Sequence, residues 1–376
     1  MTRVPASAAF MLVALLPAGV RAQTARVHDS AGVRITDNAS IATLPLRFQL
    51  AAKPDIVVGG LRDKPEDELN PRISYPGAIR LPGNRMLVPD GDQLKVFDAT
   101  GHLVMKMGRA GAGPGEFRTT QGVCRFRGDS ILAWDVGNRR ISIWSPDGKL
   151  AREFTPAGFA EVGGCLNDGS IVVDGERVTS PREDLALAKF LVVSGTGTTS
   201  ATFGPLPARF YSGSILRELK IGAHGDRFYW GDGVALGARI LDRTGKVIGI
   251  FRTADHPDPI TEASLNTHPM ACVGNPVTKV CTPEPTKATT WPAYYRFDVD
   301  DNGRVWERLN MSGQDSVWIA FDSTGKTIGK LVIPPADKTA RPQIIRFGKD
   351  EVILADLDDN GARRLSIFKL IPIGSR

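Results

Sequence analysis

Acidic and aromatic side chains stand where short apolar runs of this sequence end, and such side chains suit the recognition of a polar ligand. Asp135, Asp232 and Glu307 each come at or just beyond the end of such a run. Carboxylates accept hydrogen bonds from hydroxyl groups, and an indole offers a flat apolar face. The candidate ligand-binding residues are Asp135, Asn138, Arg139, Trp230, Asp232, Trp306, Glu307, Arg308 and Asp356.

Each of these residues also has a purely structural interpretation. An aspartate that ends a strand often accepts hydrogen bonds from the backbone of the turn that follows it. The group Asp135, Asn138 and Arg139 has the spacing of such a self-contained turn. Sequence alone therefore leaves both interpretations open.

Two segments, 298–303 and 356–361, share the pattern Asp-x-Asp-x-Asn-Gly, which resembles the first half of a calcium-binding loop. The twelfth position of such a loop carries a bidentate glutamate, but Leu309 and Ile367 stand there. A tight polar turn between strands explains the pattern equally well. We expect no cofactor and keep Ca²⁺ as the alternative.

The residues available for nucleophilic or zinc-dependent catalysis are few. The sequence has five histidines and contains neither Gly-x-Ser-x-Gly nor His-Glu-x-x-His. His224 is the one histidine whose position, after a predicted inner strand, merits attention. We assign no catalytic residue and no metal ligand, and whether the chain is an enzyme stays open.

Residues 1–22 have the layout of a secretory signal peptide. Arg3 precedes an apolar run over 8–20, and Val20-Arg21-Ala22 supplies small or modest residues before cleavage at Gln23. That run is too short to span a bilayer, and no other segment approaches a transmembrane span. We expect export to the periplasm or the cell exterior. Cleavage lowers the formal charge from +6 to +4, which is too weak and dispersed for a nucleic-acid partner.

A strand, a glycine turn and a second strand recur along the chain. The turn glycines are spaced by 47, 47, 50 and 80 residues, and the insertion 254–292 in the fifth repeat explains the last interval. They are Gly101, Gly148, Gly195, Gly245 and Gly325. Two further short strands precede each turn, so each unit has four strands, which is typical of a β-propeller blade. The predicted inner strands are 77–81, 122–126, 164–166, 219–222, 294–297 and 342–347.

The sixth unit stops after its third strand, near the C-terminus. A strand at 46–50 or 55–58 would supply the missing outer strand and remove two exposed sheet edges. The fold class is therefore all-β: a six-bladed propeller of four-stranded blades over 46–376, with a lead-in at 23–45, closed by an N-terminal strand.

Four cysteines in an exported chain indicate up to two disulfides. Cys272 and Cys281 bracket a short proline-containing loop, which predicts one pair. Cys124 and Cys165 fall on the inner strands of successive blades. They either form a second disulfide or remain two buried thiols.

Two motifs resemble the NHL-type six-bladed β-propeller family. They are Gly-Pro-Gly-Glu-Phe at 113–117 and Asp-x-x-Asn-Arg-x-Ile at 135–141, and both are clear only in the first two units. The resemblance covers most of residues 55–376 and implies a fold more than a function, because propellers serve as binding proteins, scaffolds and enzymes.

We expect an exported, monomeric, non-catalytic propeller that binds a small molecule, a glycan or a protein partner at one face of its central channel. The alternative is a metal-dependent hydrolase or lactonase resembling the gluconolactonase-like and paraoxonase-like propellers, which hold one divalent cation in the channel. The nearest available ligands for such an ion are Glu307, Asn310, Asp135 and Asp232.

Overall fold

The computed structural model describes residues 25–70, 77–156, 161–179, 185–212, 215–218, 220–267, 289–309, 315–334 and 343–374. The predicted signal peptide and the predicted Cys272–Cys281 pair lie outside these residues. The described chain is nearly all β. Its helices are α1 (Glu262–Thr267), within the 254–292 insertion, and the 3-10 turns η1 (Ile41–Thr43), η2 (Pro65–Asp67) and η3 (Arg127–Asp129). Among the described residues, none of the helices has the length and apolar content needed to cross a membrane.

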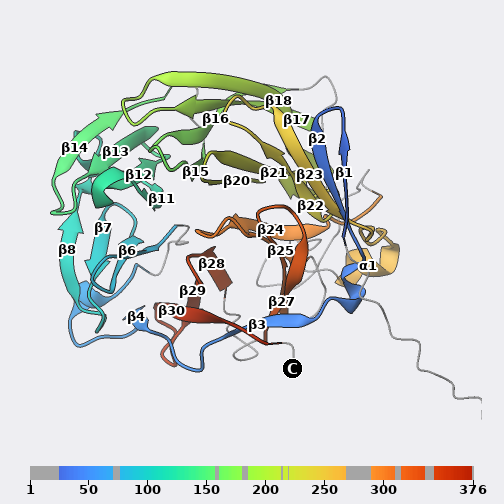
Figure 1. Ribbon diagram of the computed structural model, residues 1–376. Helices are drawn as coiled ribbons and strands as arrows, with labels where there is room; N and C mark the ends of the chain where they lie inside the picture. The colour runs from blue at the N-terminus through green and yellow to red at the C-terminus, as the bar shows by residue number, and fades with distance from the viewer. Residues whose placement is uncertain are drawn as a thin grey trace, which may run out of the picture.

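The strands form consecutive antiparallel meanders, and Figure 1 shows these meanders following one another around the molecule. The first contains β5 (Ile79–Leu81), β6 (Arg85–Pro89), β7 (Leu94–Phe97) and β8 (Leu103–Met107). The second contains β11 (Thr120–Arg125), β12 (Ile131–Asp135), β13 (Arg140–Trp144) and β14 (Leu150–Phe154). Two short strands, β9 (Arg109–Ala110) and β10 (Glu116–Phe117), pair in the loop between them.

The next two sheets have more than the four strands that the repeat predicts. A five-stranded sheet contains β15 (Glu161–Cys165), β16 (Ile171–Thr179), β17 (Leu185–Val193), β18 (Thr199–Ser212) and β19 (Ile215–Glu218). A six-stranded sheet contains β20 (Lys220–His224), β21 (Arg227–Gly231), β22 (Gly237–Leu241) and β23 (Val247–Thr253). The lead-in residues complete it, because the hairpin of β1 (Arg26–Ser30) and β2 (Val33–Asn38) pairs in parallel with β23.

The last two meanders share one nine-stranded sheet. One meander contains β24 (Tyr294–Val299), β25 (Val305–Leu309), β26 (Ser316–Phe321) and β27 (Thr327–Ile333). The other contains β28 (Gln343–Phe347), β29 (Glu351–Leu357) and β30 (Arg363–Pro372). Its fourth strand is β4 (Ile56–Gly59), which pairs antiparallel with β30, and β3 (Leu46–Leu50) lies between β27 and β30. Both N-terminal segments that the sequence offered are therefore used, β4 as the outer strand and β3 as a bridge.

Each sheet buries both of its faces against neighbouring sheets, which explains why the strands read as nearly continuous apolar runs. On β12, Ile131 and Ala133 pack against the preceding meander, whereas Leu132 packs against the following one. Successive side chains of a strand point to opposite faces. One strand therefore contributes to two separate hydrophobic clusters.

A glycine at the tip of each hairpin between third and fourth strands touches the outer strand of the preceding sheet. A β-carbon on Gly325, for example, would overlap Phe251 of β23. Five hairpins of the described chain share this contact: Gly101 meets Val57, Gly148 meets Met105, Gly197 meets Phe154, Gly245 meets Phe203, and Gly325 meets Phe251. In the third hairpin the glycine with positive φ is Gly197, at +88°, and not the Gly195 that the repeat pattern indicated.

The contact of Gly101 closes the ring, since Val57 belongs to β4, the strand that completes the last meander. The last meander itself has no such hairpin, because its third and fourth strands lie at opposite ends of the chain. At that junction β3 takes the place of the hairpin, and Phe48 packs edge-on against Trp306 with ring centroids 5.0 Å apart.

We predict that Gly325→Ala lowers the free energy of unfolding by about 3–5 kcal/mol, because the added methyl group meets both a positive φ and the base of the buried Phe251 side chain. The matched control is Gly361→Ala, where φ is +78° and nothing lies within 4 Å of the added carbon. It should cost only about 1–2 kcal/mol. Denaturant titration measures both, and equal losses would contradict the packing role of the hairpin tip.

Candidate functional site

The first strands of the meanders enclose a cavity of about 1020 Å³. Residues from β5, β11, β15, β20, β24 and β28 line it, so every meander contributes its inner strand. Cavities of several hundred cubic ångströms are the usual size for small-molecule sites. This cavity is therefore the leading candidate for a ligand site.

Apolar groups form much of the cavity wall. Val123, Phe126, Leu166, Ile221 and Phe297 are among the lining residues. The indole of Trp134 reaches the cavity from β12, because a β-carbon at Gly122 on the inner strand would occupy its place. The wall thus offers an aromatic face beside aliphatic side chains.

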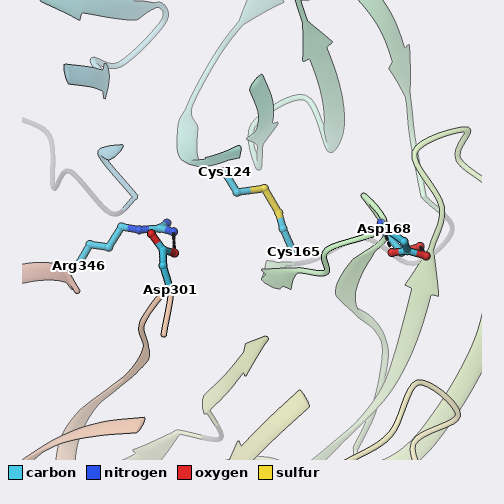
Figure 2. The surroundings of a disulfide bond; sticks show 6 residues. Cys124, Cys165, Asp168, Asp301 and Arg346 are labelled. Carbon is cyan, nitrogen blue, oxygen red and sulfur yellow. Dashed lines mark hydrogen bonds and ion pairs between the residues drawn. A yellow bond between two sulfur atoms is a disulfide. The ribbon is translucent and has the colours of Figure 1, made fainter. Parts of the chain in front are cut away.

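A disulfide ties two neighbouring inner strands on this wall. Cys124 of β11 and Cys165 of β15 are bonded, with their α-carbons 6.6 Å apart, and Figure 2 shows the bond crossing between the strands. This confirms the first of the two alternatives that the sequence left open. The bond closes a loop over a sequence separation of 41, which stabilises the fold by roughly 4 kcal/mol in the chain-entropy model.

Charged groups on the lining are mostly held in ion pairs. Arg80 of β5 lies 2.6 Å from Glu351 and 3.0 Å from Asp55. Burial raises the pKa of Glu351, while Arg80 opposes that rise. Arg125 of β11 pairs with Asp129 in the adjoining turn. Two of the basic residues on this wall are therefore neutralised by their neighbours.

A second cluster of charged side chains comes from β24, the turn after it and β28. The guanidinium of Arg346 stands 3.6 Å from the carboxylate of Asp301, and Figure 2 shows the two side chains pointing toward one another. Asp298 lies partly buried nearby and accepts hydrogen bonds from the backbone N–H groups of Phe347 and Val299. Burial raises the pKa of Asp298 to about 6, while Arg346 and those N–H groups oppose the rise.

None of the nine candidate ligand-binding residues lines this cavity. Asp135 is buried and accepts hydrogen bonds from the backbone of Arg118, Thr119, Gly137 and Asn138 at 2.7 to 3.1 Å. The side chain of Asn138 donates to the carbonyls of Gly111 and Glu116. These two residues therefore hold the Gly-Pro-Gly-Glu-Phe loop in place, as the structural interpretation proposed.

The arginine that secures this loop is the one next to the predicted residue. Arg139 is exposed at a φ of +53°. Arg140 instead donates to the carbonyl oxygens of Gly113 and Ala112 at 2.6 and 2.8 Å. Arg139 lies in the turn before β13, whereas Arg140 is the first residue of that strand, and this places the two side chains differently.

Trp306 is a correction to the sequence-based expectation, since it lies in the core and not at a mouth. Its side chain is fully buried and stacks on Phe347 with ring centroids 4.2 Å apart. Its indole N–H donates to Asp300 at 2.8 Å. Both the ring and the N–H group of Trp306 therefore contact other parts of the protein, and neither is exposed to a ligand.

The structure brings three of the candidates together: Trp230 and Asp232 at the end of β21, and Glu307 in the middle of β25. The guanidinium of Arg239 lies over the Trp230 ring at 4.4 Å and reaches Asp232 at 3.3 Å. Glu307 is fully buried and accepts hydrogen bonds from the backbone N–H of Gly237 on both oxygens. Burial raises the pKa of Glu307 to about 8, the Gly237 N–H opposes the rise, and Asp232 adds to it.

The two remaining candidates are paired with other side chains. The Arg308 guanidinium lies 5.6 Å from the centre of the Tyr295 ring. Asp356 forms a two-point contact with Arg364 at 2.9 and 2.6 Å. Neither pair belongs to the cavity wall.

The carboxylates of the two Asp-x-Asp-x-Asn-Gly segments are occupied by N–H donors. Asp300 accepts from the backbone of Asn302 and Arg304, from the Arg304 side chain and from Trp306. Asp358 accepts from the backbone of Leu61, Asn360 and Ala362. In the part of the chain that the structure describes, no three His, Cys, Asp or Glu residues are grouped to hold a metal ion. The absence of a cofactor stays a prediction, and Asn310 lies outside the described residues.

Sequence reasoning missed the charged residues of the channel, although a signal was present. A basic residue recurs on five of the six predicted inner strands: Arg80, Arg125, Lys220, Arg296 and Arg346. Four of them line the cavity, while Arg296 turns away to the carbonyl of Ile344. His224, singled out from the sequence, also lines the cavity.

Comparison with known proteins supports the fold alone. No family model matches the chain, and no curated protein matches it, so the resemblance to the NHL family stays a prediction. A putative exported protein from Bacteroides fragilis is 14% identical with a TM-score of 0.53, covering 90% of this chain and 99% of that one. A member of the DUF4221 family from Bacteroides vulgatus is 11% identical with a TM-score of 0.54, covering 88% of this chain and 99% of that one. These neighbours are propeller-like, and the chain is therefore similar to a β-propeller.

We predict that Asp135→Ala lowers the free energy of unfolding by about 2–4 kcal/mol, because it leaves several backbone N–H groups without an acceptor. Asp359→Ala is the matched control, since Asp359 is exposed. It should change stability by less than about 0.5 kcal/mol. Thermal and denaturant melts measure both. If Asp135→Ala were as stable as the native protein, the structural role would be wrong and Asp135 would again be a candidate ligand-binding residue.

We predict that Glu307→Gln becomes more stable relative to the native protein as pH rises. With a pKa moved from 4.5 to about 8, folded Glu307 keeps a proton that the unfolded chain loses, so native stability falls across that window. The glutamine variant lacks this fall, and its advantage should grow by about 2–5 kcal/mol between about pH 5 and about pH 9. Denaturant titrations at both pH values test this, with exposed Glu262→Gln as control. Parallel pH curves would contradict it.

Proposed function

We propose that this chain is an exported six-bladed β-propeller of repeated four-stranded units that binds a small ligand in its central channel without catalysing a reaction. The observation that carries the proposal is the cavity of about 1020 Å³, to which all the inner strands contribute. Its volume suits a small molecule, and its wall mixes apolar side chains with charged ones. The site is the channel itself and not the strand ends that the sequence favoured.

Repetition within the fold supports six blades. Six inner strands line the cavity, and five glycine hairpins pack in the same manner on preceding sheets. The extra strands of some sheets come from the N-terminal segment or follow the fourth strand. They therefore add to the outside of a four-stranded unit.

Export is supported by the signal-like segment 1–22 and by the Cys124–Cys165 disulfide, because such bonds persist in oxidising compartments. A structural neighbour carries the description of a putative exported protein. Two observations on the residues named for a channel-metal hydrolase support a non-catalytic role. Asp135, Asp232 and Glu307 do not line the cavity, and the Asp135 carboxylate already accepts four backbone N–H groups.

Binding of N-phenyl-1-naphthylamine, a neutral probe that fluoresces in apolar sites, tests the channel. We expect saturable binding to the mature protein. Ile221→Trp, which places a larger side chain on the cavity wall, should weaken binding at least about tenfold, or roughly 1.4 kcal/mol.

The control for this experiment is Ile371→Trp, the same substitution at a 39% exposed position of β30 that does not line the cavity. It should bind the probe like the native protein. Circular dichroism and melting curves must show that both variants fold. Equal binding by folded Ile221→Trp and native protein would rule out the channel as the site.

A further inference from the structure

Arg346 is a charged side chain on the cavity wall whose donors the protein leaves largely unused. Its side chain is 26% exposed, and its one ion pair in the described chain is the 3.6 Å approach to Asp301. That separation is too long for a hydrogen bond. A guanidinium has five N–H donors, and a partly buried donor without an acceptor costs free energy.

Lys349 stands three residues further along and adds a second positive charge to the same wall. It lines the cavity, is exposed, and takes part in no ion pair within the residues that the structure describes. Both cations come from β28 and the turn that follows it. Lys349 therefore adds a positive charge to this edge that no ion pair of the described chain neutralises.

Basic side chains outnumber acidic ones on the described lining of the cavity, which has Arg80, Arg125, Lys220, Arg346 and Lys349 against Asp298, Asp301 and Glu351. On β5 and β11 the basic residues are already paired with acids, and the lining residues of β15 carry no charge. β20 contributes Lys220 and His224. The acids of the described lining are Asp298 on β24, Asp301 in the turn after it and Glu351 on β29. Glu351 is paired with Arg80, and Asp298 accepts hydrogen bonds from backbone N–H groups.

Asp301 does not block the approach of an anion. Its side chain is 55% exposed, so its carboxylate can turn toward water when another acid occupies the space beside Arg346. A carboxylate or phosphate binds a guanidinium through two parallel hydrogen bonds, which the 3.6 Å approach of Asp301 does not supply. An incoming acid would therefore gain contacts that Asp301 does not make.

The rest of the wall is suited to an apolar group. Phe126, Ile221 and Phe297 are partly exposed and line the same cavity as Arg346, and Trp134 adds an aromatic face. A ligand that fills this space therefore needs an apolar part that covers the wall and a group that contacts the basic side chains of Arg346 and Lys349.

We propose that the channel binds an amphiphilic organic anion. Its carboxylate, sulfonate or phosphate group contacts Arg346 and Lys349, and its apolar body packs against the inner strands. This rests on the proposed function of the channel and adds the chemical class of the ligand.

The test compares two probes that differ by one acidic group: 8-anilinonaphthalene-1-sulfonate and the neutral N-phenyl-1-naphthylamine. We expect the native protein to bind the sulfonate at least about tenfold more tightly than the neutral probe. The double variant Arg346→Gln/Lys349→Gln should lose about 10- to 100-fold in affinity for the sulfonate and keep its affinity for the neutral probe. Added salt should weaken the sulfonate alone.

The matched control removes the same two charges elsewhere, as Arg34→Gln/Lys326→Gln on exposed positions of β2 and of the hairpin before β27. It should bind both probes like the native protein. Equal loss of the sulfonate in both double variants, or no preference for the sulfonate, would overturn the anion proposal and leave a neutral-ligand channel. If Ile221→Trp affects neither probe, the proposed function of the channel fails as well.

Discussion

The contact between a hairpin glycine and the outer strand of the preceding sheet is the constraint on which the rest of this structure depends. At four of the five hairpin tips a β-carbon would lie 2.1 to 2.7 Å from an atom of the neighbouring strand, and at Gly197 it would lie 3.0 Å from Phe154. The positive φ at the same residue, +82° at Gly325, adds a conformational reason for glycine. Because every contact joins two successive sheets, five such contacts set how each sheet is placed beside the next.

Ring closure follows from the same geometry. The first hairpin needs an outer strand to pack against, and only β4 from the N-terminal segment lies there. The last meander has no hairpin to offer, so β3 enters between β27 and β30 and buries Phe48 against Trp306. The N-terminal residues thus cover sheet edges that would otherwise expose unpaired backbone groups.

The sheets contact one another through hairpins at their outer strands, and the inner strands surround the channel. The inner strands carry glycines, a disulfide and charged side chains around the cavity. The charges divide into two kinds. Arg80 and Arg125 pair closely with acids, whereas Arg346 only approaches Asp301 at 3.6 Å and Lys349 takes part in no ion pair within the described residues.

Local sequence determined the strands, the repeating units, the hairpin positions and the placement of Cys124 and Cys165 on neighbouring inner strands, because alternation and turn glycines act over a few residues. Only the tertiary structure decided that both β3 and β4 take part in closure, and that Trp306 belongs to the core while Arg346 reaches the channel. Those outcomes depend on partners up to about 300 residues away and on which face of a strand turns toward the axis. The pattern of residue types along the sequence specifies neither these distant partners nor the face that turns toward the axis.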